Sequence, residues 1–149
     1  MTFSLPGLIL SVVILAPSLL LLFFRPTGMP EWVPDAGPVF TTLERVGQAG
    51  CLVAPALTAT RAELDPWLLV IGILVAGYYL LWGRYLAGGR RFSALYAPLG
   101  PLPVPMAVLP VGAFLVSAGW LWSVWVLAAA VVLGVGHIVN SWIVARSVE

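Results

Sequence analysis

Five runs of apolar residues, separated by short polar or proline-rich segments, organise the chain. Each run is about 18–23 residues long, which is the length an α-helix needs to cross the roughly 30 Å hydrocarbon core of a membrane. The pattern predicts an all-α membrane protein in which residues 1–149 form one domain, a bundle of five transmembrane helices. The predicted spans are 5–24, 38–57, 67–87, 102–119 and 123–145.

Glycine and proline mark the breaks between these runs. Four prolines in 26–38 predict a non-helical loop, and the glycine pair in 88–91 ends the third run. A turn is required in 119–123, because an unbroken helix of roughly 40 residues would measure about 60 Å, twice the hydrocarbon core. Pro110 lies inside the fourth run and is expected to kink it.

Composition excludes several functional classes. Hydrophobic residues make up 61% of the chain and charged residues 9%, with a mean hydropathy of +1.04, whereas soluble domains carry about 25% charge. A net charge of +1 gives no nucleic-acid footprint. The single cysteine, Cys51, excludes an intrachain disulfide and is expected to be a packing residue. One histidine and few carboxylates are too few ligands for a metal site, and no cofactor is expected.

The arginines predict the orientation. No Lys or Arg precedes Arg25, which argues against a cleaved signal peptide and for a retained first helix. With five spans, one side of the membrane carries only Arg61. Because positive residues favour the cytoplasm, the N-terminus is expected outside and the C-terminus inside, in a bacterial cytoplasmic membrane. The cytoplasmic side then carries Arg25, Arg84, Arg90, Arg91 and Arg146.

Polar residues within the second run are its most informative feature. Thr41, Glu44, Gln48 and Cys51 follow one another at intervals of +3, +4 and +3, so they share one helical face, with Arg45 turned away from Glu44. Glu44 is expected about 9 Å inside the cytoplasmic end of its span. Charged groups at such a depth are expensive and therefore need a reason.

Other helices bring polar or aromatic residues to the same depth. In the fifth run Gly134, His137 and Ser141 share a face with Asn140 beside it, and His137 is expected about 12 Å inside the cytoplasmic end. Two interpretations follow: these side chains either join helices through hydrogen bonds and snorkel to the interface, or they line a pocket open to the cytoplasmic leaflet. The third and fourth runs add Tyr78, Tyr79, Trp82, Tyr85 and Met106.

Two resemblances to known families accompany this pattern. LERVGQAGC at 43–51, PVPMAV at 103–108 and GHI at 136–138 resemble a small bacterial membrane-protein family of unknown function, which implies no activity. PEWVP at 30–34, GPVFTTL at 37–43 and HIVNSW at 137–142 are similar to the translocator protein, or tryptophan-rich sensory protein, family. That second resemblance implies a five-helix fold with a pocket for porphyrins, sterols and other flat apolar ligands, and it carries over Trp32 and Asn140.

The residues together favour a protein that binds a hydrophobic or amphipathic small molecule, such as a lipid, terpenoid, sterol or porphyrin, from the membrane. One alternative is an intramembrane isomerase or cyclase in which Glu44 or Asp35 donates a proton and His137 relays it. Another is a small proton-coupled transporter, and a homo-oligomer is an option that the sequence leaves open. The candidate catalytic residues are Glu44 and His137, and the candidate ligand-binding residues are Trp32, Asp35, Thr41, Gln48, Tyr78, Tyr79, Trp82, Met106, Asn140 and Ser141.

Overall fold

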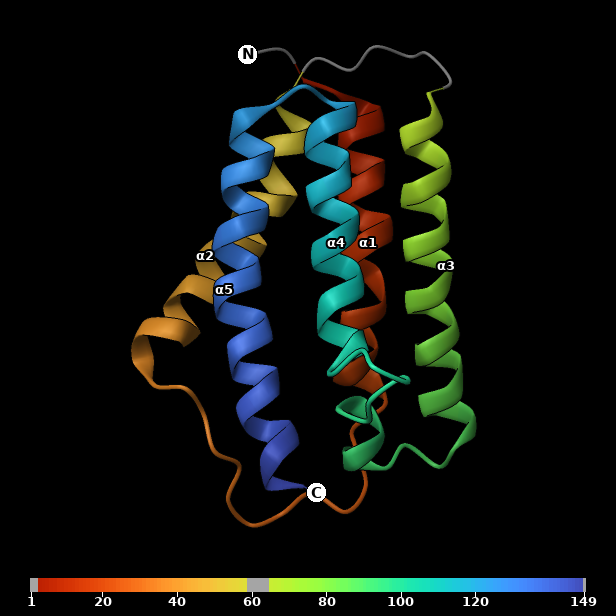
Figure 1. The fold of residues 1–149 in the computed structure, drawn as a ribbon, viewed down its shortest axis with the longest axis vertical. Coiled ribbons are helices and arrows are strands. Elements are labelled where there is room, and N and C mark those ends of the chain that lie inside the picture. Colours follow the sequence, from red (N-terminus) through yellow and green to blue (C-terminus); the bar gives the residue numbers. More distant parts are fainter. Residues whose placement is uncertain (1–2, 59–64, 149) are drawn as a thin grey trace.

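The computed structural model describes residues 3–58 and 65–148, and this part of the chain is helical without a β-strand (Figure 1). The all-α fold class is therefore confirmed. The helix limits lie within two residues of the predicted ones, except that α4 begins three residues later than expected. The elements are α1 (Leu5–Phe23), α2 (Pro38–Ala56), α3 (Pro66–Ala87), the 3-10 helix η1 (Phe92–Leu95), α4 (Pro105–Trp120) and α5 (Val124–Ser147).

Local sequence explains where the helices start. A proline stands in the first turn of α1, α2, α3 and α4, where its fixed φ suits the helix and its missing N–H costs nothing. Three helices also have a capping side chain: Ser4 accepts from the Gly7 N–H, Asp65 from the Trp67 N–H and Ser123 from the Val126 N–H. Such caps satisfy backbone donors that the first turn leaves unpaired.

The helices pack in a defined order. α5 lies along α2 on one side and α4 on the other, and α4 continues the contact to α3, while α1 packs mainly on α2 and also touches α4 and α3. The chain termini lie at opposite ends of the bundle (Figure 1). α2 and α3 lie on opposite flanks of the molecule (Figure 1). Side chains of α2 and α3 therefore belong to different helix interfaces.

Glycines permit an unusually close approach of α2 to α5. A Cβ atom added to Gly47 would collide with the backbone of Leu133, and one added to Gly136 would collide with the backbone of Glu44. At Gly50 an added Cβ would lie 2.9 Å from the Cβ of Ala129. Small residues at helix interfaces let backbones approach and increase van der Waals contact. Gly134, on the predicted inward stripe, instead faces Val111 of α4.

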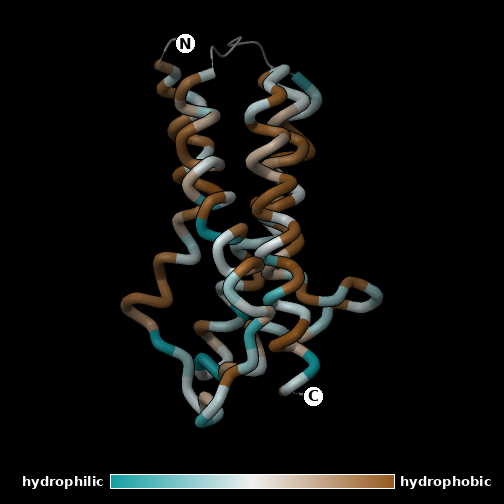
Figure 2. Tube along the Cα trace, turned by 90° about the vertical axis from the view of Figure 1, so that its left-hand side faces the viewer, coloured by the Kyte–Doolittle hydropathy of each residue, from teal (hydrophilic) through white to brown (hydrophobic). Residues whose placement is uncertain are grey.

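Three helices, α1, α3 and α5, are long and apolar enough to cross a membrane. Large apolar side chains remain exposed along them, among them Leu19, Ile73 and Val131. The tube in Figure 2 is mostly hydrophobic along the helices, and hydrophilic residues gather toward the end that holds the C-terminus. These features indicate a membrane protein.

Two loops are joined at the C-terminal end of the bundle. The Thr27 N–H donates to the Arg90 carbonyl at 2.8 Å, and the Phe92 N–H donates to the Thr27 carbonyl at 2.9 Å. The Tyr85 hydroxyl donates to the carbonyl of Phe24 at 2.9 Å. The ends of α1 and α3 are thereby held together, so the arginines that follow both helices lie at the same end.

The remaining fold predictions concern the turn before α5, the single cysteine, the proline inside α4 and the arginine expected on the outer side. The turn between the fourth and fifth helices falls at 121–123, as predicted. Cys51 is fully buried in the core, as expected of a packing residue. α4 continues through the buried Pro110 as helix. Arg61, which the charge argument places alone on the outer side, lies outside the described residues.

Candidate functional site

A hydrogen-bonded network of three side chains joins α2 to α5. His137 Nδ1 lies 2.7 Å from Glu44 Oε1, and Asn140 Nδ2 donates to Glu44 Oε2 at 2.7 Å. Asn140 Oδ1 in turn accepts the Ala36 N–H at 3.1 Å. Both carboxylate oxygens are therefore engaged, and the loop before α2 fixes which way the Asn140 amide faces.

Helical spacing and close packing create this network. His137 and Asn140 are three residues apart, so they project from neighbouring positions on one face of α5. Gly136 precedes His137 and lies against the backbone of Glu44, since no side chain separates the helices there. The contact that brings α2 close therefore also brings the carboxylate within reach of the imidazole.

The network defines the chemistry of His137. With Glu44 ionised, its carboxylate only accepts hydrogen bonds, so Nδ1 of His137 carries a hydrogen and donates it to Glu44. In a neutral imidazole Nε2 is then an acceptor, and no described residue forms a hydrogen bond with it. The His137 side chain remains 27% exposed and that of Glu44 23%. The network thus holds a basic nitrogen in a fixed orientation at a partly accessible position.

The depth of the network within the bundle differs slightly from the depth that the sequence predicts. α5 continues to Ser147, so His137 is ten residues, or about 15 Å, from the end of its helix. Figure 1 shows that α2 begins well above the level at which α5 ends, and the segment 24–37 climbs to meet it. The network therefore lies well inside the bundle, with its α2 side near the first turns of that helix.

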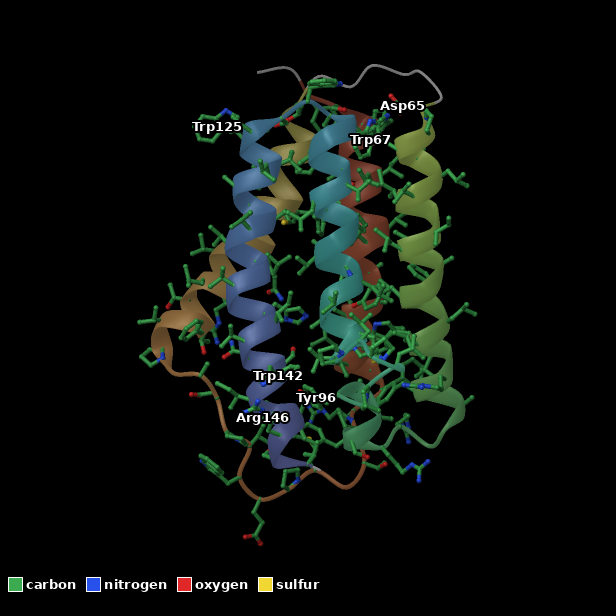
Figure 3. The ribbon with its side chains drawn as sticks, viewed as in Figure 1. Asp65, Trp67, Tyr96, Trp125, Trp142 and Arg146 are labelled. Atoms are coloured by element: carbon green, nitrogen blue, oxygen red, sulfur yellow. The ribbon has the colours of Figure 1, made fainter. Side chains whose placement is uncertain are left out.

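Two hollows lie beyond the network toward the C-terminal end. One, of about 250 Å³, is lined in part by Tyr96, Trp142 and Arg146, and the other, of about 510 Å³, by Tyr96, Arg84 and Arg91. Figure 3 shows Tyr96, Trp142 and Arg146 close together, and the Arg146 guanidinium lies 5.2 Å from the Trp142 ring centroid. Burial raises the pKa of the Tyr96 hydroxyl, and the nearby negative charge of Glu44 adds to this effect.

The predicted aromatic residues form a separate cluster on the other side of α4. Tyr78 and Trp82 pack edge to face with ring centroids 6.3 Å apart, together with Tyr85 and Met106. The buried Trp82 Nε1 has no hydrogen-bond partner within the described part of the chain. Tyr79 points elsewhere and donates to the Val13 carbonyl at 2.8 Å. This cluster packs α3 against α4 and does not meet the Glu44–His137 network.

The other predicted ligand-binding residues are dispersed. Gln48 lines a groove between α1 and α2 together with Arg45. The Thr41 hydroxyl donates to the Gly37 carbonyl, while Asp35 Oδ1 accepts the Gly37 N–H at 2.8 Å and so shapes the start of α2. Trp32 is 75% exposed, and Ser141 is partly buried on α5. The structure therefore divides the predicted residues: it brings Glu44, His137 and Asn140 together in the network and Tyr78, Trp82 and Met106 together in the aromatic cluster, and it leaves the others apart.

Sequence reasoning missed four contributors to this region. Ala36 acts through its backbone, which leaves no residue-type signal. Gly136 and Gly47 carried a signal, since glycine inside a helix needs a packing reason, but their partners could not be inferred without the helix order. Tyr96 lies after η1 in an irregular segment that has no periodicity.

Comparison with known proteins yields no assignment: the chain matches no family model, and no curated protein or solved structure resembles it significantly.

Proposed function

We propose that this protein is a five-helix membrane protein that binds an amphipathic small molecule at its cytoplasmic end, with His137 holding the polar head. The observation that carries the proposal is the pair of 2.7 Å hydrogen bonds that fix Glu44 between His137 and Asn140. These bonds engage Nδ1 and leave Nε2 of a side chain that is 27% exposed for a ligand. Buried carboxylates commonly orient a functional imidazole in this way.

The surroundings support a ligand with one polar end. A neutral His137 offers Nε2 as an acceptor for a hydroxyl or carboxyl hydrogen. The hollow of about 250 Å³ that lies beyond the network is lined in part by Tyr96, Trp142 and Arg146 and not by His137 itself, and these residues add a hydroxyl, an aromatic face and a cation. Apolar pockets with a few placed polar groups are typical of small-molecule sites. The proposed ligand is therefore an isoprenoid, sterol-like or acyl compound with a hydroxyl or acidic head.

Lipid analysis of purified protein tests the proposal. Wild-type protein, His137→Ala and the control Val135→Ala, which alters an exposed apolar side chain on α5, are purified identically, and their organic extracts are compared by mass spectrometry. A non-phospholipid amphiphile with a hydroxyl or acidic head is expected with wild type and with Val135→Ala, and not with His137→Ala. Identical extracts from three variants of equal melting temperature would refute the proposal.

The five-span topology is tested separately. A C-terminal reporter that is active only in the cytoplasm is expected to be active in a bacterial host, because Arg25, Arg84, Arg90, Arg91 and Arg146 would all lie on that side. The same reporter fused after Thr58, at the end of α2, should be inactive. Activity only from a periplasm-specific C-terminal reporter would reject both the orientation and the number of spans.

A second candidate function rests on the same geometry. A carboxylate that orients an imidazole is the arrangement of many general bases, so His137 Nε2 is placed to accept a proton from a lipid-like or terpenoid substrate. Glu44 and Asn140 would then position the base without touching the substrate. Conversion of the ligand during incubation with wild-type protein, and not with His137→Ala, would favour an enzyme, whereas unchanged ligand favours a binding protein.

A further inference from the structure

We propose that the groove between α1 and α2 is a binding site for one anionic phospholipid, whose head group pairs with Arg45. The groove encloses about 500 Å³, and its walls include Val12, Leu15, Leu19 and Leu52, with Arg45 and Gln48 as its charged and amide-bearing members. This inference requires α1 to cross a bilayer, but it does not depend on the ligand proposed for His137.

A hydrogen bond between the two helices fixes the depth of Arg45. The Ser11 hydroxyl donates to the Cys51 carbonyl at 2.9 Å, which sets the register of α1 against α2. Arg45 lies six residues before Cys51, or about 9 Å toward the end of α1. Since α1 runs twelve residues beyond Ser11, to Phe23, Arg45 stands about 9 Å inside the span.

Arg45 forms no ion pair with a carboxylate in the described part of the chain, although the charge of Glu44 is near enough to act on it through space. The neighbouring Glu44 is turned toward α5, where His137 and Asn140 occupy both of its oxygens. The one ion pair found among the described residues is His137–Glu44. An exposed guanidinium within an apolar span is costly unless it reaches an anion, and arginine is well suited to pair with a phosphate.

The shape of the groove favours a lipid over a free anion. Val12, Leu19 and Leu52 are exposed apolar side chains. By the Ser11–Cys51 register, Leu19 lies near the level of Arg45, while Val12 and Leu52 continue the groove toward the middle of α1, where an acyl chain would lie. On the proposed topology Arg45 belongs to the cytoplasmic half of the bilayer, whose leaflet carries the anionic lipids. Arg45 therefore suits the anionic head group of such a lipid, and the apolar walls of the groove suit its acyl chain.

Native mass spectrometry tests this site with phosphatidylglycerol and phosphatidylcholine of identical acyl chains. Wild-type protein is expected to retain one phosphatidylglycerol about fivefold more tightly than phosphatidylcholine, the effect of one basic residue near an anionic head group. Arg45→Gln should abolish the preference, while Arg25→Gln, which removes an arginine just beyond α1, should keep it. Ala49→Phe, which fills the groove at an exposed position and leaves Arg45 intact, should reduce retention of both lipids.

Each contrary result is informative. Equal retention of the two lipids by wild type, or an unchanged preference in Arg45→Gln, would overturn the proposal, as would full retention by Ala49→Phe. Displacement of the lipid by millimolar inorganic phosphate would assign the groove to a free anion instead. His137→Ala is expected to keep the lipid preference, and its loss there would place the lipid at the polar network, against the present inference.

Discussion

Gly136→Ala is expected to destabilise the protein strongly although it adds a single methyl group. The new Cβ would meet the backbone of Glu44 and the carbonyl of Phe40, the latter at 2.8 Å. Backbone cannot rotate away as a side chain can, so α2 has to separate from α5. Overpacking of this kind costs about 1–3 kcal/mol or more, which exceeds the gain of about 1 kcal/mol from replacing a helical glycine by alanine.

The chain offers matched controls for this prediction. At Gly72 of α3 an added Cβ meets nothing within 4 Å, so Gly72→Ala should leave the melting temperature in detergent unchanged or raise it. Gly134→Ala should have an intermediate effect, since its neighbour at 3.0 Å is a Val111 methyl group. Equal melting temperatures for Gly136→Ala and Gly72→Ala would show that the close α2–α5 contact does not exist in the membrane protein.

Glu44→Gln is expected to preserve the fold and invert the tautomer of His137. Ala36 holds Asn140 so that its Nδ2 donates toward the side chain at position 44. The carbonyl oxygen of the introduced amide would therefore face Asn140, and its NH₂ group would face His137. Because an amide NH₂ donates, Nδ1 must become the acceptor and the ring hydrogen must move to Nε2. The loss of one charge-assisted hydrogen bond should cost no more than about 3 kcal/mol.

The single histidine of the chain makes this measurable. In mildly alkaline buffer, where an imidazole is neutral, ¹⁵N NMR of histidine-labelled protein should show hydrogen on Nδ1 in wild type and on Nε2 in the variant. The altered Nε2 can no longer accept a hydroxyl hydrogen, so the amphiphile or its turnover should be lost as well. The control Gln48→Glu changes a residue in the other groove and should leave the tautomer as in wild type. A wild-type ring protonated on Nε2 would contradict the network.

The depth of a residue along its helix can be predicted from the sequence, because it depends only on the constant rise per residue. Glu44 and His137 were placed at similar depths by counting residues along separate helices, and the structure brings them to 2.7 Å. The same counting placed Tyr78 and Met106 at this depth, and these two do meet, but across the α3–α4 interface. Depth says how far along the bundle a residue lies and nothing about which neighbour it faces.

The grouping of Thr41, Glu44, Gln48 and Cys51 on one face shows the same limit on a smaller scale. Helical spacing puts all four within one broad stripe. In the bundle that stripe is divided between two neighbours, so Glu44 meets α5 whereas Gln48 lines the groove beside α1 and Cys51 is buried in the core. A stripe about 100° wide is shared whenever two helices flank it.

The sequence by itself determined the helical architecture, the helix limits to within a few residues and the apolar character that suits a membrane, because hydrophobic length and proline position are local properties. Only the tertiary structure decided the order of helices around the bundle. That order depends on which surfaces fit, here on Gly47 and Gly136 admitting a neighbouring backbone, and the partner atoms lie far away along the chain. For this reason the carboxylate–imidazole–amide network, and not the larger predicted pocket, emerged as the candidate site.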